Sequence, residues 1–434
     1  MGTHFDSEAE LNINRLFPIK YVILILQSIF RVYMRFKRLF EKATKTHVLL
    51  DITRLVGRAR SNIMPTGVDR VSMAYVQHYY SHARAVLAEG RFVAVLNKSD
   101  SKKAFDYLLS PNPDTDYVMK RLIMKARLTA WLRPKVKEQV LINTSHTGVG
   151  HDLYAIGLRK RNVKLVFMVH DVIPITHPEF CRPDEKIKHH KRIDNILKFA
   201  SGIIANSKFT LDALSNEAEK LGVPKPHSTI AHLAPGFTSK PYKRRPIKSP
   251  YFVMLSTIEP RKNHNLLFRI WRKLVEEMGK DAPKLVLIGR RGWECENVVD
   301  ILERSEILRD FLIEKSDCPD RELCTYLSHA QALLFPTLVE GYGMPVIESL
   351  MVNTPVIATD LTVFHEIAGE VPDYLDYLDG VGWLNTIKAY MDNNHPMRLA
   401  QLERMKSYQS PSWDSHFEKV NTLIHFILAT NATP

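Results

Sequence analysis

Short apolar segments alternate with helical patterns along most of this 434-residue chain. Such alternation is typical of a parallel sheet with helices on both of its faces. In the first half, the segments predicted to form strands are residues 47–52, 91–96, 139–143, 165–169, 202–205 and 228–232. A helix is indicated by the spacing of Ile193, Ile196, Leu197 and Ala200. We therefore predict an α/β fold built on doubly wound sheets.

The alternation stops at residues 237–250 and then starts again. That stretch holds three prolines and five basic residues, which is typical of a linker. Beyond it, strands are predicted at residues 251–255, 284–288, 332–335 and 355–358, with helices after Asn263, Asp320, Met344 and Thr362. The predicted organisation is an N-terminal segment (1–45), a first domain (46–240), a linker (241–250), a second domain (251–410) and a closing helical segment (411–434). Two such domains place a ligand between the carboxyl ends of their strands.

The charge balance indicates an anionic partner. A formal net charge of +13 suits nucleic acid, acidic lipid or a phosphorylated substrate. The four cysteines show no Cys-x-x-Cys spacing, and no signal-peptide cleavage pattern precedes the first predicted strand. We expect reduced thiols, a cytoplasmic location and no zinc site.

The N-terminal segment is predicted to contain a basic amphipathic helix. Residues 21–30 are apolar but too few for a membrane span, which takes ~20 residues. On a helix that continues to residue 42, one face is apolar and another carries Arg31, Arg35, Arg38 and Lys42. We expect residues 20–42 to lie on an acidic inner-membrane surface. The same residues also suit a helix that packs on the first domain, or a single span through Tyr33, which would bury Arg31.

Residues 335–348 hold two carboxylates, Glu340 and Glu348, around a Gly-Tyr-Gly turn. Gly341 and Gly343 let backbone N–H groups approach a ligand closely, and the helix predicted after them presents an N-terminus that favours phosphate. Carboxylates accept hydrogen bonds from hydroxyls, and a sugar nucleotide carries hydroxyls on both sides of its diphosphate. The segment therefore suits a sugar nucleotide.

Two adjacent cations, Arg261 and Lys262, follow the first predicted strand of the second domain. Arginine can bind two phosphate oxygens and lysine supplies a point charge, so this loop suits a diphosphate. Gly289 and Arg290 follow the next strand, where they could contact the base or the phosphates.

Loops of the first domain hold further candidates. Gly67 follows the first strand and can present N–H groups to a phosphate or a sugar, although an ordinary helix cap also explains it. His170 ends a buried strand and suits contact with a sugar hydroxyl. Asn206, Ser207 and Lys208 are acceptor-side candidates, and helix capping by Ser207 explains this segment equally well.

In this order, and over about residues 47–420, these segments resemble the retaining GT-B glycosyltransferases of family 4, whose Glu-x7-Glu motif matches Glu340 and Glu348. The resemblance implies two Rossmann-like domains that face a cleft. It assigns Glu340 to donor-sugar hydroxyls and Glu348 to ribose hydroxyls. Arg261 and Lys262 would stabilise the departing nucleoside diphosphate. Thr257 stands where the commoner Gly-Arg-Leu-x-x-x-Lys pattern has its arginine, and Arg261 would replace it, as in the Glu-Pro-Arg-Lys-Asn variant of mannosyltransferases.

The predicted site has two groups of residues. The catalytic group is His170, Arg261, Lys262 and Glu340. The donor-binding group is Gly67, Thr257, Gly289, Arg290, Gly341, Tyr342, Gly343, Met344 and Glu348. The resemblance also implies a front-face reaction without a protein nucleophile, and a closing helix that crosses back to the first domain.

The predicted activity is transfer of a hexose to a glycan or lipid-linked glycan acceptor in bacterial O-antigen or capsule synthesis. The donor expected first is GDP-mannose, with a UDP-sugar as the second candidate. The sequence is also compatible with a GT-B nucleotide-sugar epimerase and with a non-enzymatic basic protein that binds membrane or nucleic acid. No metal or other cofactor is expected, because Asp114-Thr115-Asp116 is predicted to be a solvated turn and the histidines, His189 and His190 among them, lack metal-binding neighbours. No P-loop is present.

Overall fold

The computed structural model describes residues 48–61, 65–89, 92–110, 113–129, 139–237 and 239–430, all within the compact unit His47–Pro434. The amphipathic helix predicted at residues 20–42 lies outside these ranges. Within them, no helix is long and apolar enough to cross a membrane.

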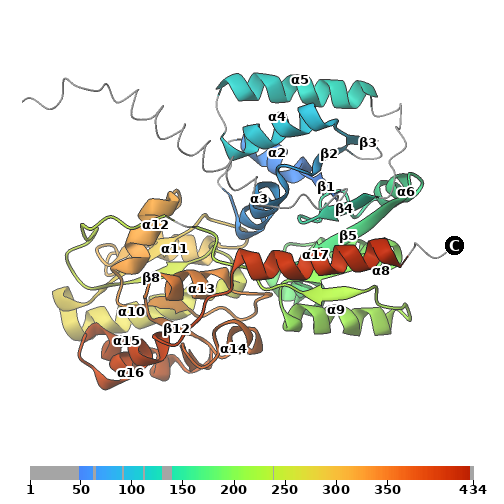
Figure 1. Ribbon diagram of the computed structural model, residues 1–434. Coiled ribbons are helices and arrows are strands. Elements are labelled where there is room, and N and C mark those ends of the chain that lie inside the picture. The colour runs from blue at the N-terminus through green and yellow to red at the C-terminus, as the bar shows by residue number, and fades with distance from the viewer. Residues whose placement is uncertain are drawn as a thin grey trace, which may run out of the picture. The chain divides into compact units, whose positions relative to one another are not determined.

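The first sheet has the strand order β3-β2-β1-β4-β5-β6-β7 (Figure 1). Its strands are β1 (Val48–Asp51), β2 (Arg84–Glu89), β3 (Phe92–Val95), β4 (Gln139–Asn143), β5 (Val163–Val169), β6 (Gly202–Ala205) and β7 (Ser228–Ile230). The edge strand β3 is antiparallel to β2, and the other pairs are parallel.

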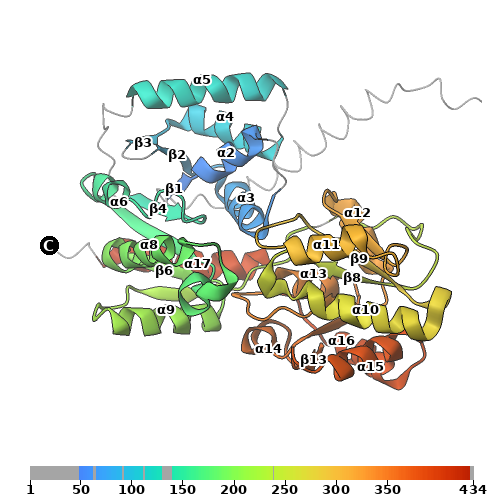
Figure 2. The same ribbon diagram turned by 180° about the vertical axis from the view of Figure 1, so that it is seen from behind.

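Helices cover both faces of this sheet, as the two opposite views show (Figures 1 and 2). They are α2 (Thr53–Arg60), α3 (Gly67–Tyr79), α4 (Lys98–Leu109), α5 (Pro113–Thr129), α6 (Asp152–Arg159), α7 (Ile173–Thr176), α8 (Glu185–Phe199) and α9 (Lys208–Lys220). Alternate strand residues enter different cores, with Leu50 in one and Leu49 in the other. Strands buried on both faces are continuously apolar, which is why they are visible in the sequence.

The second sheet has the order β10-β9-β8-β11-β12-β13, with all pairs parallel. Its strands are β8 (Tyr251–Leu255), β9 (Lys284–Ile288), β10 (Leu312–Lys315), β11 (Leu333–Phe335), β12 (Val356–Thr359) and β13 (Asp373–Leu375). The helices are α10 (His264–Met278), α11 (Glu296–Arg304), α12 (Asp320–Ser328), α13 (Met344–Met351), α14 (Thr362–Ala368), α15 (Gly380–Met391) and α16 (Pro396–Met405). The strand order reverses between β8 and β11, and ligands bind at such a switch point in doubly wound sheets.

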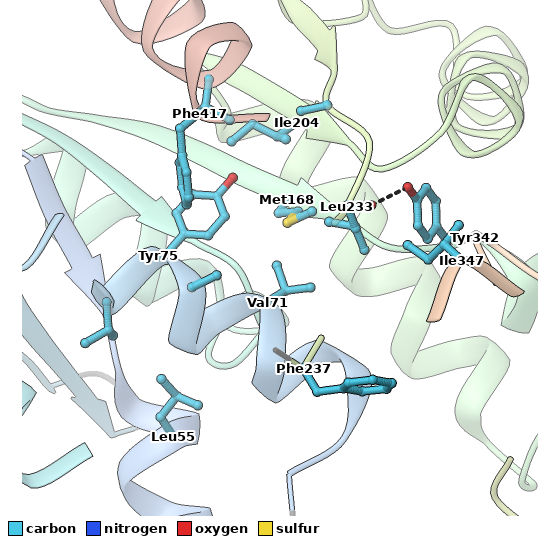
Figure 3. Close-up of a cluster of buried hydrophobic side chains, with 14 of the residues drawn as sticks. Leu55, Val71, Tyr75, Met168, Ile204, Leu233, Phe237, Tyr342, Ile347 and Phe417 are labelled. Atoms are coloured by element: carbon cyan, nitrogen blue, oxygen red, sulfur yellow. Dashed lines mark hydrogen bonds between the residues drawn. The ribbon is translucent and has the colours of Figure 1, made fainter. Parts of the chain in front are cut away.

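The last helix, α17 (Trp413–Ala429), packs on the first sheet although it follows the second one in sequence (Figure 1). The Tyr75 hydroxyl lies 2.8 Å from His416 Nε2, and the Tyr75 and Phe417 rings meet edge to face with centroids 5.0 Å apart. Figure 3 shows Phe417 against Tyr75, beside Ile204 of β6. The chain therefore passes between the two sheets twice.

Three strands and one helix differ from the sequence predictions. β2, β10 and β13 were not predicted. Charged or small residues interrupt the apolar pattern of each, and β10 and β13 are also short. The prediction of a solvated turn at Asp114-Thr115-Asp116 is wrong, because these residues lie in the first turn of α5. Proline is favoured at a helix start, and Pro113 begins this helix.

Candidate functional site

The candidate site lies where β8 and β11 end, at the switch point of the second sheet. A short 3-10 helix (Pro260–Lys262) follows β8 and carries two cations. The loop after β11 leads to Glu340 and is tied to the first loop, because Leu338 N donates to Arg261 O at 2.8 Å. The two loops therefore hold one another in place.

Four charged side chains form a closed cluster in these loops. Glu340 Oε1 pairs with Lys262 Nζ in a very close contact and with Arg261 Nη1 at 3.1 Å. Arg261 Nε also pairs with Glu259 Oε1 at 2.7 Å. Thr337 Oγ1 donates to Glu340 Oε1 at 3.1 Å. The two cations and two carboxylates of these four side chains balance in formal charge, and the negative charge of Asp171 also acts on Arg261.

The protonation states follow from burial and from these pairs. Burial alone would raise the pKa of Glu340, but Lys262 and Arg261 outweigh it and lower that pKa to about 2. Burial, followed by repulsion from Arg261, lowers the pKa of Lys262. Burial raises the pKa of Glu259. At neutral pH, Glu340 is therefore an ionised carboxylate that can accept hydrogen bonds.

Gly341 brings this cluster against His170 of the first domain. A Cβ atom at Gly341 would lie 2.3 Å from His170 O and 2.7 Å from Asp171 Cβ, so no side chain fits there. Gly341 O accepts hydrogen bonds from Ser207 Oγ at 2.8 Å and from Thr210 Oγ1 at 3.1 Å. The two domains meet here backbone to backbone.

The His170 ring is fixed in one tautomer. Its Nε2 lies 2.7 Å from the Thr144 carbonyl, which can only accept, so Nε2 carries the hydrogen and Nδ1 has a free lone pair. Burial lowers the pKa of His170 below its ordinary value, so the ring is neutral at physiological pH. The His146 ring lies 5.7 Å away and has an even more strongly lowered pKa, again mainly because of burial. His170 can therefore accept a hydrogen bond from a hydroxyl.

Glu348 lies in a second contact between the domains. Its Oε1 accepts a hydrogen bond from Gly236 N at 3.1 Å. Arg70 Nη1 donates to Gly236 O at 3.1 Å, and the Arg70 guanidinium forms two hydrogen bonds with Asp320. Burial raises the pKa of Glu348 to about 7, and the Arg70 charge and the Gly236 N–H only partly counter it. Glu348 therefore changes its charge near neutral pH.

Gly67 stands at the N-terminus of α3, opposite Met344. A Cβ atom at Gly67 would lie 3.9 Å from Met344 Cγ. The loop is held by Asp69, which accepts hydrogen bonds from Thr66 N and Thr66 Oγ1 and pairs with Arg54 at 2.8 Å and Arg58 at 2.6 Å. Two arginines on one buried carboxylate leave excess positive charge beside Gly67.

Thr257, Gly289 and Arg290 lie on neighbouring strand ends of the second sheet. Gly289 has a φ of +148°, and a Cβ atom there would lie 1.9 Å from Ser256 O. Arg290 O accepts a hydrogen bond from Ile258 N at 2.8 Å. Burial lowers the pKa of Arg58 most, and the positive charges of Arg54 and then Arg290 lower it further. Since Arg58 belongs to α2, Arg290 lies near that helix of the first domain.

Tyr342 does not present its side chain to a donor. The ring is buried and its hydroxyl donates to Leu233 O at 2.6 Å (Figure 3). Gly343 caps α13 with a φ of +107°, and its Cα faces the Phe364 ring. Among the glycine-rich turn residues, only backbone groups remain for a ligand.

The predicted acceptor-side residues join elements together. Asn206 Nδ2 donates to His170 O at 2.8 Å, and Ser207 Oγ caps α9 by accepting from Thr210 N at 3.0 Å. Lys208 Nζ pairs with Asp212, and Lys208 N donates to Glu366 Oε1 at 2.5 Å. These contacts match the helix-capping role considered for Ser207.

Several residues of the site were not predicted, and two pairs of them had a visible signal. Arg54 and Arg58 are one helical turn apart after the first strand, and Thr66-x-x-Asp69 has the spacing of a capping box. Arg70 and Asp320 meet across 250 residues, which no local pattern reveals.

In the described ranges, no group of three or more His, Cys, Asp or Glu side chains is placed to hold a metal ion.

Comparisons with known proteins agree with this geometry. Residues 238–371 match the family of glycosyl transferases group 1, and this range contains Arg261, Lys262, Glu340 and Glu348. The chain is 27% identical over 253 residues to the serotype-specific mannosyltransferase WbdA of Escherichia coli, a match covering 53% of this chain and 30% of WbdA. It is 32% identical over 148 residues to the O-antigen chain mannosyltransferase RfbU of Salmonella typhimurium, covering 32% of this chain and 38% of RfbU. These matches span well under half of either relative.

The fold is also found in solved structures. The Anabaena protein Alr3699/HepE, crystallised with UDP, superposes with a TM-score of 0.57 at 14% identity, over 90% of this chain and all of that one. Residues 238–371 are therefore similar in sequence to the group 1 glycosyltransferases, and the solved structure shows the fold alone. The prediction of a GT-B fold is confirmed, and so is the resemblance to group 1 glycosyltransferases. Membership of family 4 stays a prediction.

Proposed function

We propose that this protein is a glycosyltransferase that transfers mannose from GDP-mannose to a glycan acceptor of a bacterial cell-surface polysaccharide. The observation that carries the proposal is the cluster of Glu259, Arg261, Lys262 and Glu340 at the switch point of the second sheet. It lies inside the segment that matches group 1 glycosyltransferases, and the relatives with matching sequence are mannosyltransferases. Location at the cytoplasmic face of the inner membrane is part of the proposal.

The ion pairs of this cluster suggest how the donor would be accepted. A nucleoside diphosphate would compete with Glu340 for Arg261 and Lys262, because both anions bind the same two cations. Once Arg261 and Lys262 bind the diphosphate, the Glu340 carboxylate can accept hydrogen bonds from sugar hydroxyls. Arg261 and Lys262 would then stabilise the charge that grows on the leaving diphosphate.

His170 and Glu348 would complete the donor site. His170 Nδ1 is an acceptor for a sugar hydroxyl beside the reacting carbon, since Nε2 is held by Thr144. Glu348 would bind ribose hydroxyls, which would replace Gly236 N as its hydrogen-bond donor. Retention of configuration, a front-face reaction and independence of metal ions are likewise proposed.

Release of nucleoside diphosphate from a panel of GDP- and UDP-sugars tests this proposal. We expect release from GDP-mannose and loss of that release in Lys262→Ala. Preference for a UDP-sugar would refute the GDP-mannose donor while leaving a transferase of the same fold. Conversion of the donor to an epimer without release of nucleotide would support an epimerase instead.

A further inference from the structure

The residues predicted to face the acceptor are occupied by contacts that hold the fold together. Asn206 donates to a backbone carbonyl, Ser207 caps α9, and Lys208 pairs with Asp212. Asn206 and Ser207 are also buried. An acceptor sugar therefore needs another polar group on the side of the first domain.

Asp171 is a polar residue of the first domain at its contact with the second domain. It follows His170 just beyond the end of β5, and a Cβ atom at Gly341 would lie 2.7 Å from Asp171 Cβ. Asp171 Oδ1 accepts a hydrogen bond from Ile173 N at 3.1 Å, which fixes the carboxylate. Among the residues that the structure describes, Asp171 Oδ2 has no hydrogen-bond partner and no cation pairs with it. Since Asp171 is partly exposed, Oδ2 is left for a ligand.

The charge of Asp171 acts on residues of the proposed donor site. Burial would lower the pKa of Arg261, but Glu340, then Glu259 and then Asp171 raise it. Burial also lowers the pKa of His170, and the Asp171 charge partly counters this effect after the hydrogen bond with the Thr144 carbonyl. Asp171 therefore lies near both the His170 ring and a cation that would bind the diphosphate.

The charge and position of Asp171 limit what it can bind. A carboxylate repels phosphates, so Asp171 is unsuited to the diphosphate of the donor. It accepts hydrogen bonds from hydroxyls. The donor sugar would already use Glu340 and the Nδ1 atom of His170. The hydroxylated ligand that still lacks a partner is the acceptor.

We propose that Asp171 Oδ2 binds a hydroxyl of the acceptor sugar. The inference rests on the proposed function and adds to it the residue that holds the acceptor. A hydroxyl bound there would lie beside His170, on the side of the first domain, while the second domain holds the diphosphate. The role of Asp171 is to bind and orient this hydroxyl.

Steady-state kinetics of the full chain test this role, with GDP-mannose as donor and methyl α-mannopyranoside as the acceptor probe. Asp171→Asn keeps an oxygen for Ile173 N but replaces the accepting Oδ2 with a donating amide. We expect the KM for the mannoside to rise at least about tenfold, the loss of one hydrogen bond to a charged group. The KM for GDP-mannose should not rise, because the charge that is lost repels the diphosphate. Asp184→Asn, at an exposed carboxylate of the same domain, is the control and should leave the KM for the mannoside unchanged.

Two results would overturn this inference while leaving the proposed function intact. An unchanged KM for the mannoside in Asp171→Asn would show that Asp171 does not hold the acceptor. A raised KM for GDP-mannose in the same variant would place Asp171 on the donor side. If Asp171→Asn has a lowered melting temperature, Asp171→Ser replaces it, because a serine hydroxyl can also accept from Ile173 N, and the same rise is expected. An unmodified protein that releases no nucleotide from any donor sugar would instead refute the proposed function, and this inference with it.

Discussion

Arg70 of α3 binds Asp320 of α12 through both ends of its guanidinium, with Nη1 2.9 Å from Oδ2 and Nη2 2.5 Å from Oδ1. Arg70 also donates a hydrogen bond to the carbonyl oxygen of Gly236, and the N–H of Gly236 donates to the buried Glu348. One arginine thus joins the first helix after the Gly67 loop to the second domain. It also supplies the positive charge nearest to a carboxylate with a raised pKa.

A double-mutant cycle should reveal this link. Arg70→Ala and Asp320→Ala should each destabilise the protein, and their effects should not add, with a coupling energy of about 1–3 kcal/mol from urea unfolding. The matched control is the exposed pair Lys273 and Glu277, which should show coupling of at most about 0.5 kcal/mol. Additive effects of Arg70→Ala and Asp320→Ala would contradict the link.

Glu348→Gln should flatten the pH dependence of stability. The pKa of Glu348 is raised from 4.5 to about 7 in the folded state, so the folded protein holds a proton that the unfolded chain releases. Its stabilising contribution is complete below about pH 4.5 and is lost as pH rises through about 7. Between these values the unmodified protein should lose on the order of 3 kcal/mol relative to Glu348→Gln. If the melting temperatures of the two proteins changed equally with pH across this range, the raised pKa of Glu348 would be refuted.

Lys262→Ala should lower kcat/KM for sugar transfer by about 10²–10³-fold, the loss expected when one preorganised charge at a leaving group is removed. Folding should survive, because Glu340 keeps Arg261 as a partner. Glu340→Gln should reduce transfer as well, since an amide accepts hydroxyl hydrogen bonds less strongly than a carboxylate. Lys273→Ala, at an exposed pair, is the control. Full activity of Lys262→Ala would show that Lys262 has no role in transfer.

Gly341→Ala should push the two domains apart. The new Cβ would lie 2.3 Å from His170 O, and neither backbone can yield easily while Ser207 and Thr210 bind Gly341 O. We expect a loss of about 1–3 kcal/mol in stability and a loss of transfer activity. Gly157→Ala, inside α6 with nothing within 4 Å, should instead gain up to about 1 kcal/mol. Equal melting temperatures for Gly341→Ala and the unmodified protein would show that the contact is dispensable.

Sequence reasoning found the strands that are buried on both faces. Residues 251–255 and 284–288 were predicted at the bounds that β8 and β9 have, because a strand covered on both sides is apolar throughout. It missed β10, where Glu314 and Lys315 occupy half of an edge strand. An edge tolerates charged residues, so the pattern disappears there.

The same limit applies to the site. Strand ends are visible in a sequence, so the loops that carry Arg261, Lys262 and Glu340 could be located in advance. The hydrogen-bond partners of the site side chains could not be predicted, because these partners are distant in sequence. Tyr342 reaches the Leu233 carbonyl across 109 residues, and Glu348 meets Gly236 across 112.

The return of α17 to the first sheet has a consequence for synthesis on the ribosome. A Cβ atom at Gly202 would lie 2.4 Å from Ile427 Cδ1, and Tyr79 OH donates to Asn421 Oδ1 at 2.7 Å, so the first domain is closed by the last helix of the chain. About 190 residues separate Phe237 from the end of α17, which corresponds to roughly 10–40 s of translation. Throughout that interval the nascent first domain exposes the apolar face that α17 later covers, and so offers chaperones a binding site with a defined lifetime.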